Sequence, residues 1–379
     1  MNDYVPALKL LNKKLIPVVN TTGKVNVFFE VTDSSAKKGS LHIYINGNLV
    51  KENTFNTTAA NTFNYSDSIL LSQGINNIEA EYTNSSSIES RKEKLAVSYS
   101  SAKKIQPKVW FVGVGISKYK DAAMNLKYPV KDIKDIANDF KKKYPGLIID
   151  TLLNEKATKE NILALHDKLM NTGINDKVIV SFSGHGLLSD SLDWYFATQD
   201  IDFKKPEALG LSYAMMEGIL NGIPARKKLL LLDACHSGEV DKDEDITFAN
   251  KETPMETNVV TTQTAARGNI LINKPKAGLQ TSFEMMQDLF ANIGNGNGTT
   301  VLSAAGGKEY ALESDQWKNG VFTYSLLKAL KDPATDENGN KKISVKELKK
   351  AVFIAVKTLT GGRQKPTSRV ELLDDWDIW

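Results

Sequence analysis

Two apolar runs, each ending in a short polar turn that contains glycine, place the strongest limit on the fold of this 379-residue chain. Residues 177–182 lead into Ser183-Gly184-His185-Gly186, and residues 229–232, all leucine, lead into Asp233-Ala234-Cys235-His236-Ser237-Gly238. A buried strand that ends this way delivers its last side chains to the edge of a sheet, where open α/β folds place their ligands. If the two strands are neighbours, His185 and Cys235 lie side by side. A thiol beside an imidazole is a candidate nucleophile.

The apolar pattern after the first hundred residues is that of strands alternating with amphipathic helices. This order predicts an α/β fold with a mostly parallel sheet flanked by helices. Besides the two runs above, strands are predicted at 109–115, 147–153 and 299–305, a hairpin around 194–200, and an edge strand after Arg363. Helices are predicted from Pro129 and at 159–169, 212–220, 321–330 and 345–359.

The first hundred residues alternate apolar and polar side chains, as in Val25, Val27, Phe29 and Val31. Asn46-Gly47 follows another alternating run and indicates a type I′ hairpin turn. Further strands are expected at 75–82 and 95–99. We therefore predict a small all-β sandwich, immunoglobulin-like in outline, over 1–100, a linker over 101–107 and the second domain over 108–379. The sandwich carries no catalytic constellation, so it is interpreted as a spacer or docking module; regulation of the active site is the alternative.

Composition excludes several classes of protein. The net charge is +3, from 48 basic and 45 acidic residues, and no long basic run marks a nucleic-acid partner. The only cysteine, Cys235, leaves no internal disulfide or thiolate metal cluster. The sequence has neither a signal peptide pattern nor an apolar run long enough for a bilayer. We expect a soluble chain with no membrane partner, of unknown compartment with the cytoplasm favoured; it could also be a fragment of a longer protein.

The two glycine-containing motifs resemble those of the caspase/metacaspase group of caspase-like cysteine peptidases, of the bacterial metacaspase-like or orthocaspase-like type. The resemblance rests on His185-Gly186 and on the Asp-x-Cys-x-Ser-Gly of 233–238, and it extends from about Pro107 to the end of the chain. Cys235 follows His185 by 50 residues, as in caspases.

The resemblance implies a cysteine endopeptidase that acts on protein or peptide substrates. Cys235 would attack the peptide carbonyl, His185 would carry the proton to the leaving amine, and the N–H groups of Gly186 and Cys235 would form the oxyanion hole. No third catalytic residue is evident. The reaction requires no cofactor.

Three residues are predicted to form a substrate-binding S1 pocket for arginine or lysine. Asp233 points to the same side of its strand as Cys235. Asp132 stands where the resemblance implies an S1 aspartate, although residues 126–132 lack the Gly-Cys and Asn of the metacaspase pattern. Ser183 is the third. Carboxylates favour a cationic substrate side chain through charge-assisted hydrogen bonds. For Asp132, an ordinary solvated helix position is the alternative.

Two loops are predicted to lie near the active site. Residues 239–276 are rich in polar residues and poor in apolar periodicity, which is typical of a solvated loop. The resemblance makes this loop a candidate for self-cleavage, with Arg267 as the processing site. A second loop, with Asp315 and Trp317, is predicted to form a wall of the substrate cleft; alternatively, Trp317 is a surface cap on the following helix.

Residues 336–347 fit much of an EF-hand loop. Positions 1, 3, 5, 9 and 12 are Asp336, Asn338, Asn340, Ser344 and Glu347. The sixth position, where glycine is required, is Lys341, and only two carboxylates are present. We expect this loop to bind calcium weakly or not at all; calcium remains a possible ligand.

Other interpretations of the same residues stay open. Cys235 could be a small buried core residue, because free cysteine often packs as a hydrophobe. The domain could be a catalytically inactive caspase-like scaffold or docking protein, with the β-sandwich binding the partner. It could also be a cysteine hydrolase that acts on non-peptide amides, since that chemistry uses the same pair of residues.

Overall fold

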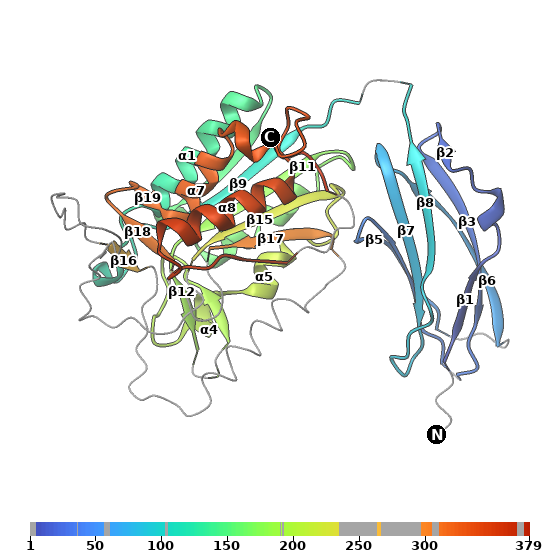
Figure 1. Ribbon diagram of the computed structural model, residues 1–379. Helices are drawn as coiled ribbons and strands as arrows, with labels where there is room; N and C mark the ends of the chain where they lie inside the picture. The colour runs from blue at the N-terminus through green and yellow to red at the C-terminus, as the bar shows by residue number, and fades with distance from the viewer. Residues whose placement is uncertain are drawn as a thin grey trace.

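An all-β region is followed by an α/β region in the computed structural model of the chain (Figure 1). The structure describes residues 5–35, 37–56, 61–102, 105–189, 191, 193–234, 297–304, 311–369 and 375–379, and the backbone of 264–266. No helix in this described part of the chain has the length and apolar character needed to cross a bilayer.

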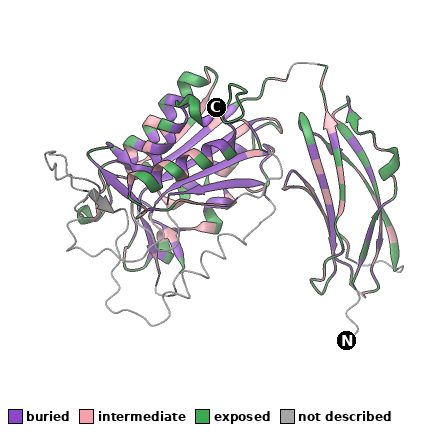
Figure 2. Cartoon of the chain, viewed as in Figure 1, coloured by how far each residue is buried: buried purple, intermediate pink, exposed green. Residues whose placement is uncertain are grey.

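The all-β region consists of two sheets that enclose one apolar core. One sheet has the order β1-β3-β6 and the other β2-β8-β7-β4-β5. Buried and exposed residues alternate along the strands, as period-2 side-chain geometry requires (Figure 2). The strands are β1 Ala7–Leu10, β2 Val19–Asn20, β3 Lys24–Thr32, β4 Ser40–Ile45, β5 Asn48–Thr54, β6 Thr62–Leu70, β7 Gly74–Thr83 and β8 Glu93–Tyr99. The predicted β-sandwich is confirmed.

The turn between β4 and β5 has the conformation that its sequence predicts. Asn46 has φ 49° and Gly47 has φ 75°. Positive φ at both central residues is the requirement of a type I′ turn, which asparagine and glycine meet at the lowest steric cost.

The α/β region is built on a six-stranded sheet with the order β10-β9-β11-β15-β17-β20. Its strands are β9 Val109–Gly115, β10 Ile148–Leu153, β11 Lys177–Ser183, β15 Lys227–Asp233, β17 Thr299–Ser303 and β20 Thr367–Arg369. All pair in parallel except β20, which runs antiparallel at the edge. The predicted α/β sheet is therefore confirmed.

Helices cover both faces of this sheet (Figure 1). One face packs against α1 Pro129–Lys143, α7 Val321–Ala329 and α8 Val345–Leu359; the other packs against α2 Lys159–Leu163, α3 Leu165–Leu169 and α5 Tyr213–Gly218. The leucine run of β15 serves both cores, with Leu229 and Leu231 on one side and Leu230 and Leu232 on the other. Burial on both faces explains why this strand is continuously apolar.

Short elements complete the α/β region, and the structure corrects the sequence prediction at two places. The short elements are η2 Ala122–Met124, η3 Asn154–Lys156, β12 Gly186–Leu188, β13 Trp194–Phe196, α4 Pro206–Leu209, β14 Leu211–Ser212, β16 Thr264–Ala266, β18 Leu312–Ser314, β19 Asn319–Gly320 and η4 Pro333–Thr335. The helix predicted at 159–169 is divided at Ala164, where ψ is −12°. The hairpin predicted around 194–200 is instead formed by β12 and β13, because residues 186–188 supply the partner strand.

Candidate active site

The two strands that carry the sequence motifs are neighbours, as predicted. β11 and β15 pair in parallel with Ser183 opposite Asp233. The N–H of Gly184 donates a hydrogen bond to the carbonyl oxygen of Asp233 at 3.3 Å, which continues the pairing beyond the strands. His185 therefore follows one strand end while Ala234 follows the other. Cys235 comes next in the sequence and lies outside the described residues.

His185 is held in a buried aromatic setting, with 1% of its surface exposed. Its backbone N–H donates to the hydroxyl oxygen of Tyr119 at 2.9 Å. The Tyr119 ring lies 5.0 Å from the imidazole, and the Phe203 ring lies 5.8 Å away and nearly perpendicular to it. These contacts fix both the backbone and the ring of His185.

The imidazole Nε2 of His185 lies 2.8 Å from the carbonyl oxygen of Met124. A carbonyl oxygen can only accept a hydrogen bond, so Nε2 carries the proton in the neutral ring and Nδ1 has the lone pair. The short helix η2 that presents Met124 is capped by Asp121, whose carboxylate accepts from the N–H of Ala123 at 3.0 Å. Nδ1 is thus the atom of His185 that can accept a proton.

Gly184 permits the close packing that positions His185. A Cβ at this residue would lie 2.9 Å from the Tyr119 hydroxyl oxygen and 3.1 Å from the Phe196 ring. Any larger side chain would displace these aromatic groups. Gly186, predicted for the oxyanion hole, begins β12 and pairs with Phe196.

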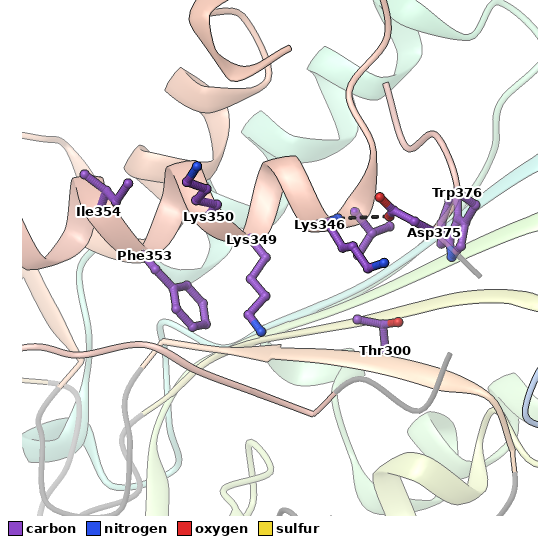
Figure 3. A pocket seen from close by; sticks show the side chains of 9 residues that line it. Thr300, Lys346, Lys349, Lys350, Phe353, Ile354, Asp375 and Trp376 are labelled. Carbon is purple, nitrogen blue, oxygen red and sulfur yellow. Dashed lines mark hydrogen bonds between the residues drawn. The ribbon is translucent and has the colours of Figure 1, made fainter. Parts of the chain in front are cut away.

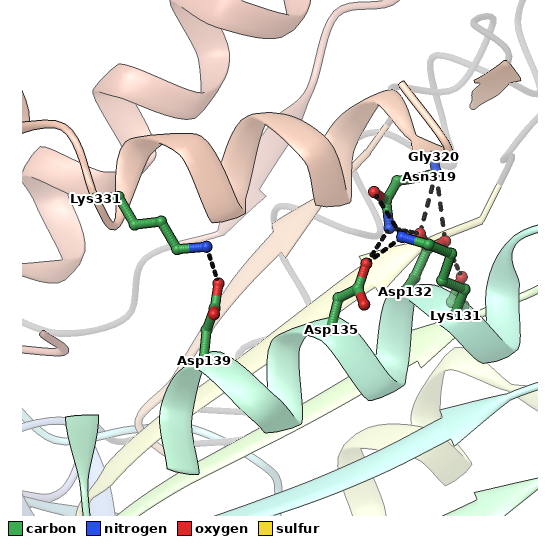
Figure 4. Close-up of polar contacts among 8 residues, drawn as sticks. Lys131, Asp132, Asp135, Asp139, Asn319, Gly320 and Lys331 are labelled. Carbon is green, nitrogen blue, oxygen red and sulfur yellow. Dashed lines mark hydrogen bonds and ion pairs between the residues drawn. The ribbon is translucent and has the colours of Figure 1, made fainter. Parts of the chain in front are cut away.

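Asp132 and Ser183, two of the predicted S1 residues, are in contact. Both are fully buried, and the Ser183 hydroxyl donates to Oδ2 of Asp132 at 3.0 Å. The Asp132 carboxylate also accepts from the side-chain amide of Asn319 at 2.8 Å and from the N–H of Gly320 at 3.2 Å (Figure 4). Asp132 is therefore not the solvated helix residue that the sequence left as an alternative.

Asp233, the third predicted S1 residue, caps the first turn of α7. Its Oδ2 accepts from the hydroxyl of Thr323 at 2.6 Å and from the N–H of Thr323 at 3.2 Å, and the residue is 2% exposed. Gly320, which binds Asp132, is the residue directly before the same helix. The two carboxylates thus meet the amino end of α7, where the helix dipole stabilises negative charge.

Acidic residues continue along the face of α1 that meets α7 (Figure 4). Asp135 pairs with Lys131 and accepts from Asn319 at 3.0 Å. Asp139 is 5% exposed and pairs with Lys331. Each of these two carboxylates therefore has a lysine partner.

The two predicted substrate-loop residues differ in their exposure. The Asp315 side chain is 61% exposed and bonds to Lys127 and Tyr128; the bond from Lys127, followed by that from Tyr128, lowers the pKa of Asp315. Trp317 is only 6% exposed and packs in the core with α1 and α7. Its burial excludes the alternative of a surface cap and leaves little of the ring to line a cleft.

The EF-like segment adopts a compact loop ahead of α8. Asp336 accepts from the N–H of Asn340 at 3.1 Å and from that of Lys341 at 2.7 Å. Lys341 has φ 65°, the left-handed conformation for which glycine is preferred at this position. The turn at the sixth position of the loop therefore forms although this position is lysine and not glycine.

The last predicted calcium ligand, Glu347, is engaged in capping α8. Its two oxygens accept from the N–H of Ser344 at 2.9 Å and of Asn338 at 3.2 Å. Burial acts to raise the pKa of Glu347, but these hydrogen bonds outweigh it and the pKa is lowered. Among the described residues, no group of three or more histidine, cysteine, aspartate or glutamate residues is arranged to hold a metal ion.

The predicted processing loop is described only at β16, Thr264–Ala266. This strand pairs antiparallel with β18, and β18 pairs with β19. Ala265 stands opposite Glu313, which stands opposite Gly320. Arg267 follows β16 directly and lies outside the described residues.

A groove of about 520 Å³ lies between α8, β17 and the C-terminal residues (Figure 3). It is lined by apolar groups such as Phe353 and Trp376 and by Lys346, Lys349 and Lys350. The groove contains none of the predicted site residues, so its size does not mark the active site.

Two groups that contact His185 were not predicted from the sequence. The Met124 carbonyl is a backbone atom, so no residue type signals it. Tyr119 is one of 12 tyrosines, and it reaches His185 from a loop in which the N–H of Leu126 donates to the carbonyl oxygen of Ser117 at 2.9 Å. Asn125 is the one clue, since asparagine commonly stabilises such turns; its side chain accepts from the N–H of Tyr119 at 2.8 Å.

Comparison with known proteins agrees with this architecture. The family described as "Caspase domain" (Peptidase_C14) matches residues 112–375, and no curated protein matches the chain. Among solved structures, the crystal structure of protein GSU0716 from Geobacter sulfurreducens is similar at 18% identity and a TM-score of 0.44, over 69% of this chain and 92% of that one. A likeness at that level carries no argument about function. The family match covers most of the chain, and the chain belongs to the caspase-domain peptidase family.

Proposed function

We propose that this protein is a cysteine endopeptidase in which Cys235 and His185 form the catalytic dyad. The observation that carries the proposal is the pairing of Ser183 with Asp233, which sets the ends of β11 and β15 side by side. Only Gly184 separates Ser183 from His185, and only Ala234 separates Asp233 from Cys235. Membership of the caspase-domain family supports the same reaction class.

The tautomer of His185 indicates how the proton would move. Nε2–H stays directed at the Met124 carbonyl, so Nδ1 takes the Cys235 thiol proton as the sulfur attacks the peptide carbonyl carbon. The N–H groups of Gly186 and Cys235 would stabilise the oxyanion. Collapse breaks the C–N bond, and the proton on Nδ1 passes to the leaving amine. Water, deprotonated by Nδ1, then hydrolyses the thioester and regenerates the thiol.

We infer that the enzyme cleaves after arginine or lysine. The support is the pair of buried carboxylates, Asp132 and Asp233, at the amino end of α7. Ser183 holds one oxygen of Asp132, which orients that carboxylate. A cationic substrate side chain would form charge-assisted hydrogen bonds with such a group, whereas an aspartate side chain would be repelled.

Self-cleavage after Arg267 is proposed as the activating step. The three residues before Arg267 form β16 and lie beside β18, two strands from the Gly320 N–H that binds Asp132. Addition of an extended segment to a sheet edge is a common mode of peptide binding. The position of β16 beside β18 supports Arg267, the next residue in the sequence, as the candidate cleavage site.

The β-sandwich is proposed to serve as a docking or spacer module, and its immunoglobulin-like outline remains a prediction. No cofactor is proposed for catalysis. Calcium is kept as a weak ligand of the 336–347 loop.

The test is hydrolysis of matched fluorogenic peptides that end in Arg, Lys or Asp, with Cys235→Ala as the blank. Turnover of the Arg or Lys peptide that depends on Cys235 is expected. Cleavage of the Asp peptide alone would retain the peptidase and reject the acidic pocket. If no peptide is cleaved, even after limited proteolysis, the protein is better explained as an inactive scaffold. Turnover of non-peptide amides alone would indicate a cysteine hydrolase that acts on such amides.

Mass spectrometry of the active protein tests self-cleavage. We expect fragments that end at Arg267, and an intact bond there in both Cys235→Ala and Arg267→Ala. An intact chain in a fully active preparation would refute the activating role.

A further inference from the structure

A cleft of about 450 Å³ lies between the β-sandwich and the α/β region. Residues of β5 and β6 line it from one side, and residues between 221 and 228 line it from the other. Its volume is within the range of small-molecule sites. Arg226, which lines the cleft, directly precedes the seven-residue strand β15, so the cleft is about 20 Å along that strand from Asp233. It is a site separate from the proposed catalytic residues.

The charged residues that line the cleft are all cationic. Of its lining residues that the structure describes, Lys51, Arg226 and Lys228 are cationic and none is acidic. Lys51 is at the exposed rim and pairs with Asp67 at 3.0 Å. Lys228 is 2% exposed, and its Nζ lies 3.4 Å from the carbonyl oxygen of Leu220. Cations gathered on low-dielectric walls raise the local concentration of anions.

Arg226 is the buried centre of this charge, with 7% of its surface exposed. Its guanidinium donates to the Leu70 carbonyl oxygen at 2.7 Å and lies 3.5 Å from the Ser72 hydroxyl, which are both neutral acceptors from the β-sandwich. Burial lowers the pKa of Arg226 to about 10. No ion pair joins it to a carboxylate in the described part of the chain. A buried cation without a counterion is costly, and a bound anion would offset that cost.

Asn48 adds a requirement for a hydrogen-bond donor. Its Nδ2 donates to the carbonyl oxygens of Ile45, Asn46 and Arg226, which fixes the orientation of the amide. Oδ1 of this 4% exposed residue accepts no hydrogen bond from the described residues. A hydroxyl group of a ligand would satisfy this oxygen.

We propose that the cleft binds a small hydroxyl-bearing anion, a phosphate or a carboxylate, which pairs with Arg226 and donates a hydroxyl to Asn48. Because the lining comes from both regions, the anion fastens the β-sandwich to the α/β region. This proposal is independent of the peptidase proposal.

Calorimetric titration and thermal unfolding of the full-length chain test it. Inorganic phosphate and citrate are the probes, and chloride at matched ionic strength is the control. We expect saturable binding and a raised Tm with at least one probe; the two arms distinguish a phosphate from a carboxylate. Arg226→Gln should weaken binding by about tenfold or more, as expected for loss of a charged hydrogen bond. Arg91→Gln, an exposed arginine of the β-sandwich, should leave it unchanged.

Asn221→Asp provides a second variant that retains the size of the side chain. Asn221 lines the cleft and accepts from Asn297 at 2.7 Å, and aspartate can accept the same bond. The new carboxylate should abolish binding while the protein stays folded. The proposal would be overturned if the unmodified chain shows no saturable binding. It would also be overturned if Arg226→Gln and Asn221→Asp bind the probe as tightly as the unmodified chain.

Discussion

The carbonyl oxygen of Met124 lies 2.8 Å from Nε2 of His185, although 61 residues separate them in the chain. This contact assigns the Nε2 proton and makes Nδ1 the basic atom of the ring. The Tyr119 hydroxyl, which accepts from the His185 N–H, holds the same residue from its backbone side. The proposed base is therefore oriented by two groups from one loop.

Replacing Tyr119 with phenylalanine tests this support. Tyr119→Phe removes the acceptor of a buried N–H, and we expect a loss of about 1–3 kcal/mol in the free energy of unfolding. The kcat for the Arg peptide should fall while KM changes little, because the ring of His185 loses its fixed position. Denaturant unfolding and steady-state kinetics measure the two effects. Tyr195→Phe, a half-exposed tyrosine of β13, serves as the control; unchanged kcat in Tyr119→Phe would contradict the positioning role.

Asp132 and Asp135 offer a matched pair for the specificity proposal. Asp132→Asn should raise KM for Arg and Lys peptides by about tenfold or more, because it removes the charge that would pair with the substrate. Asp135→Asn should leave KM unchanged, since this residue already pairs with Lys131. Circular dichroism checks that both variants fold. Equal KM values in the two variants would exclude Asp132 as an S1 residue.

The bond between Asp233 and Thr323 is expected to stabilise the fold. Thr323→Val keeps the shape of the side chain but removes the hydroxyl that donates to the buried carboxylate at 2.6 Å. We expect a loss of about 1–3 kcal/mol in the free energy of unfolding. Thr358→Val removes an exposed hydroxyl that donates to the Ile354 carbonyl and should change stability little. Similar stabilities of the two variants would mean that the cap of α7 is unimportant.

Calcium is expected to bind the 336–347 loop only weakly. Glu347 already accepts two backbone hydrogen bonds, and the loop offers only two carboxylates at ligand positions. Calorimetry should show binding no tighter than about the millimolar range, and Asp336→Ala should abolish it. Micromolar binding that Asp336→Ala removes would show that the loop is a true calcium site.

The partly buried Lys177 should make the free energy of unfolding depend on pH. Burial, and next the repulsion from Lys227, lower the pKa of Lys177 to about 8 from 10.5. The folded state therefore loses this proton at lower pH than the unfolded state. Unfolding free energy should rise as pH increases from about 8 toward 10.5, with an amplitude on the order of 1–2 kcal/mol after solvent screening.

Lys177→Met should remove this rise and increase stability at pH 7, where the wild-type lysine is charged and partly buried. Denaturant unfolding at pH 7, 8 and 9 measures the difference. If the free energy of unfolding rises equally with pH in the wild type and in Lys177→Met, Lys177 is not the cause of the rise.

Much of the fold was predictable because local periodicity reports burial. The alternation of Val25 to Val31 gave one face of β3, and the leucines at 229–232 marked a strand buried on both faces. Asn46-Gly47 specified its turn through backbone conformation alone. The division of the helix at Ala164 was not predicted, because a change in ψ within an apolar periodic segment leaves no signal in the sequence.

The sequence alone determined the strand and helix order, the two motifs and the family resemblance. Only the tertiary structure decided that the Met124 carbonyl faces His185, that Trp317 is buried, and that Asp132 and Asp233 both meet the first turn of α7. Asp132 and Asn319 are 187 residues apart in the chain. A hydrogen bond over that separation depends on how whole helices pack on the sheet, and backbone donors such as the Gly320 N–H are present at every residue except proline, so residue identity cannot reveal them.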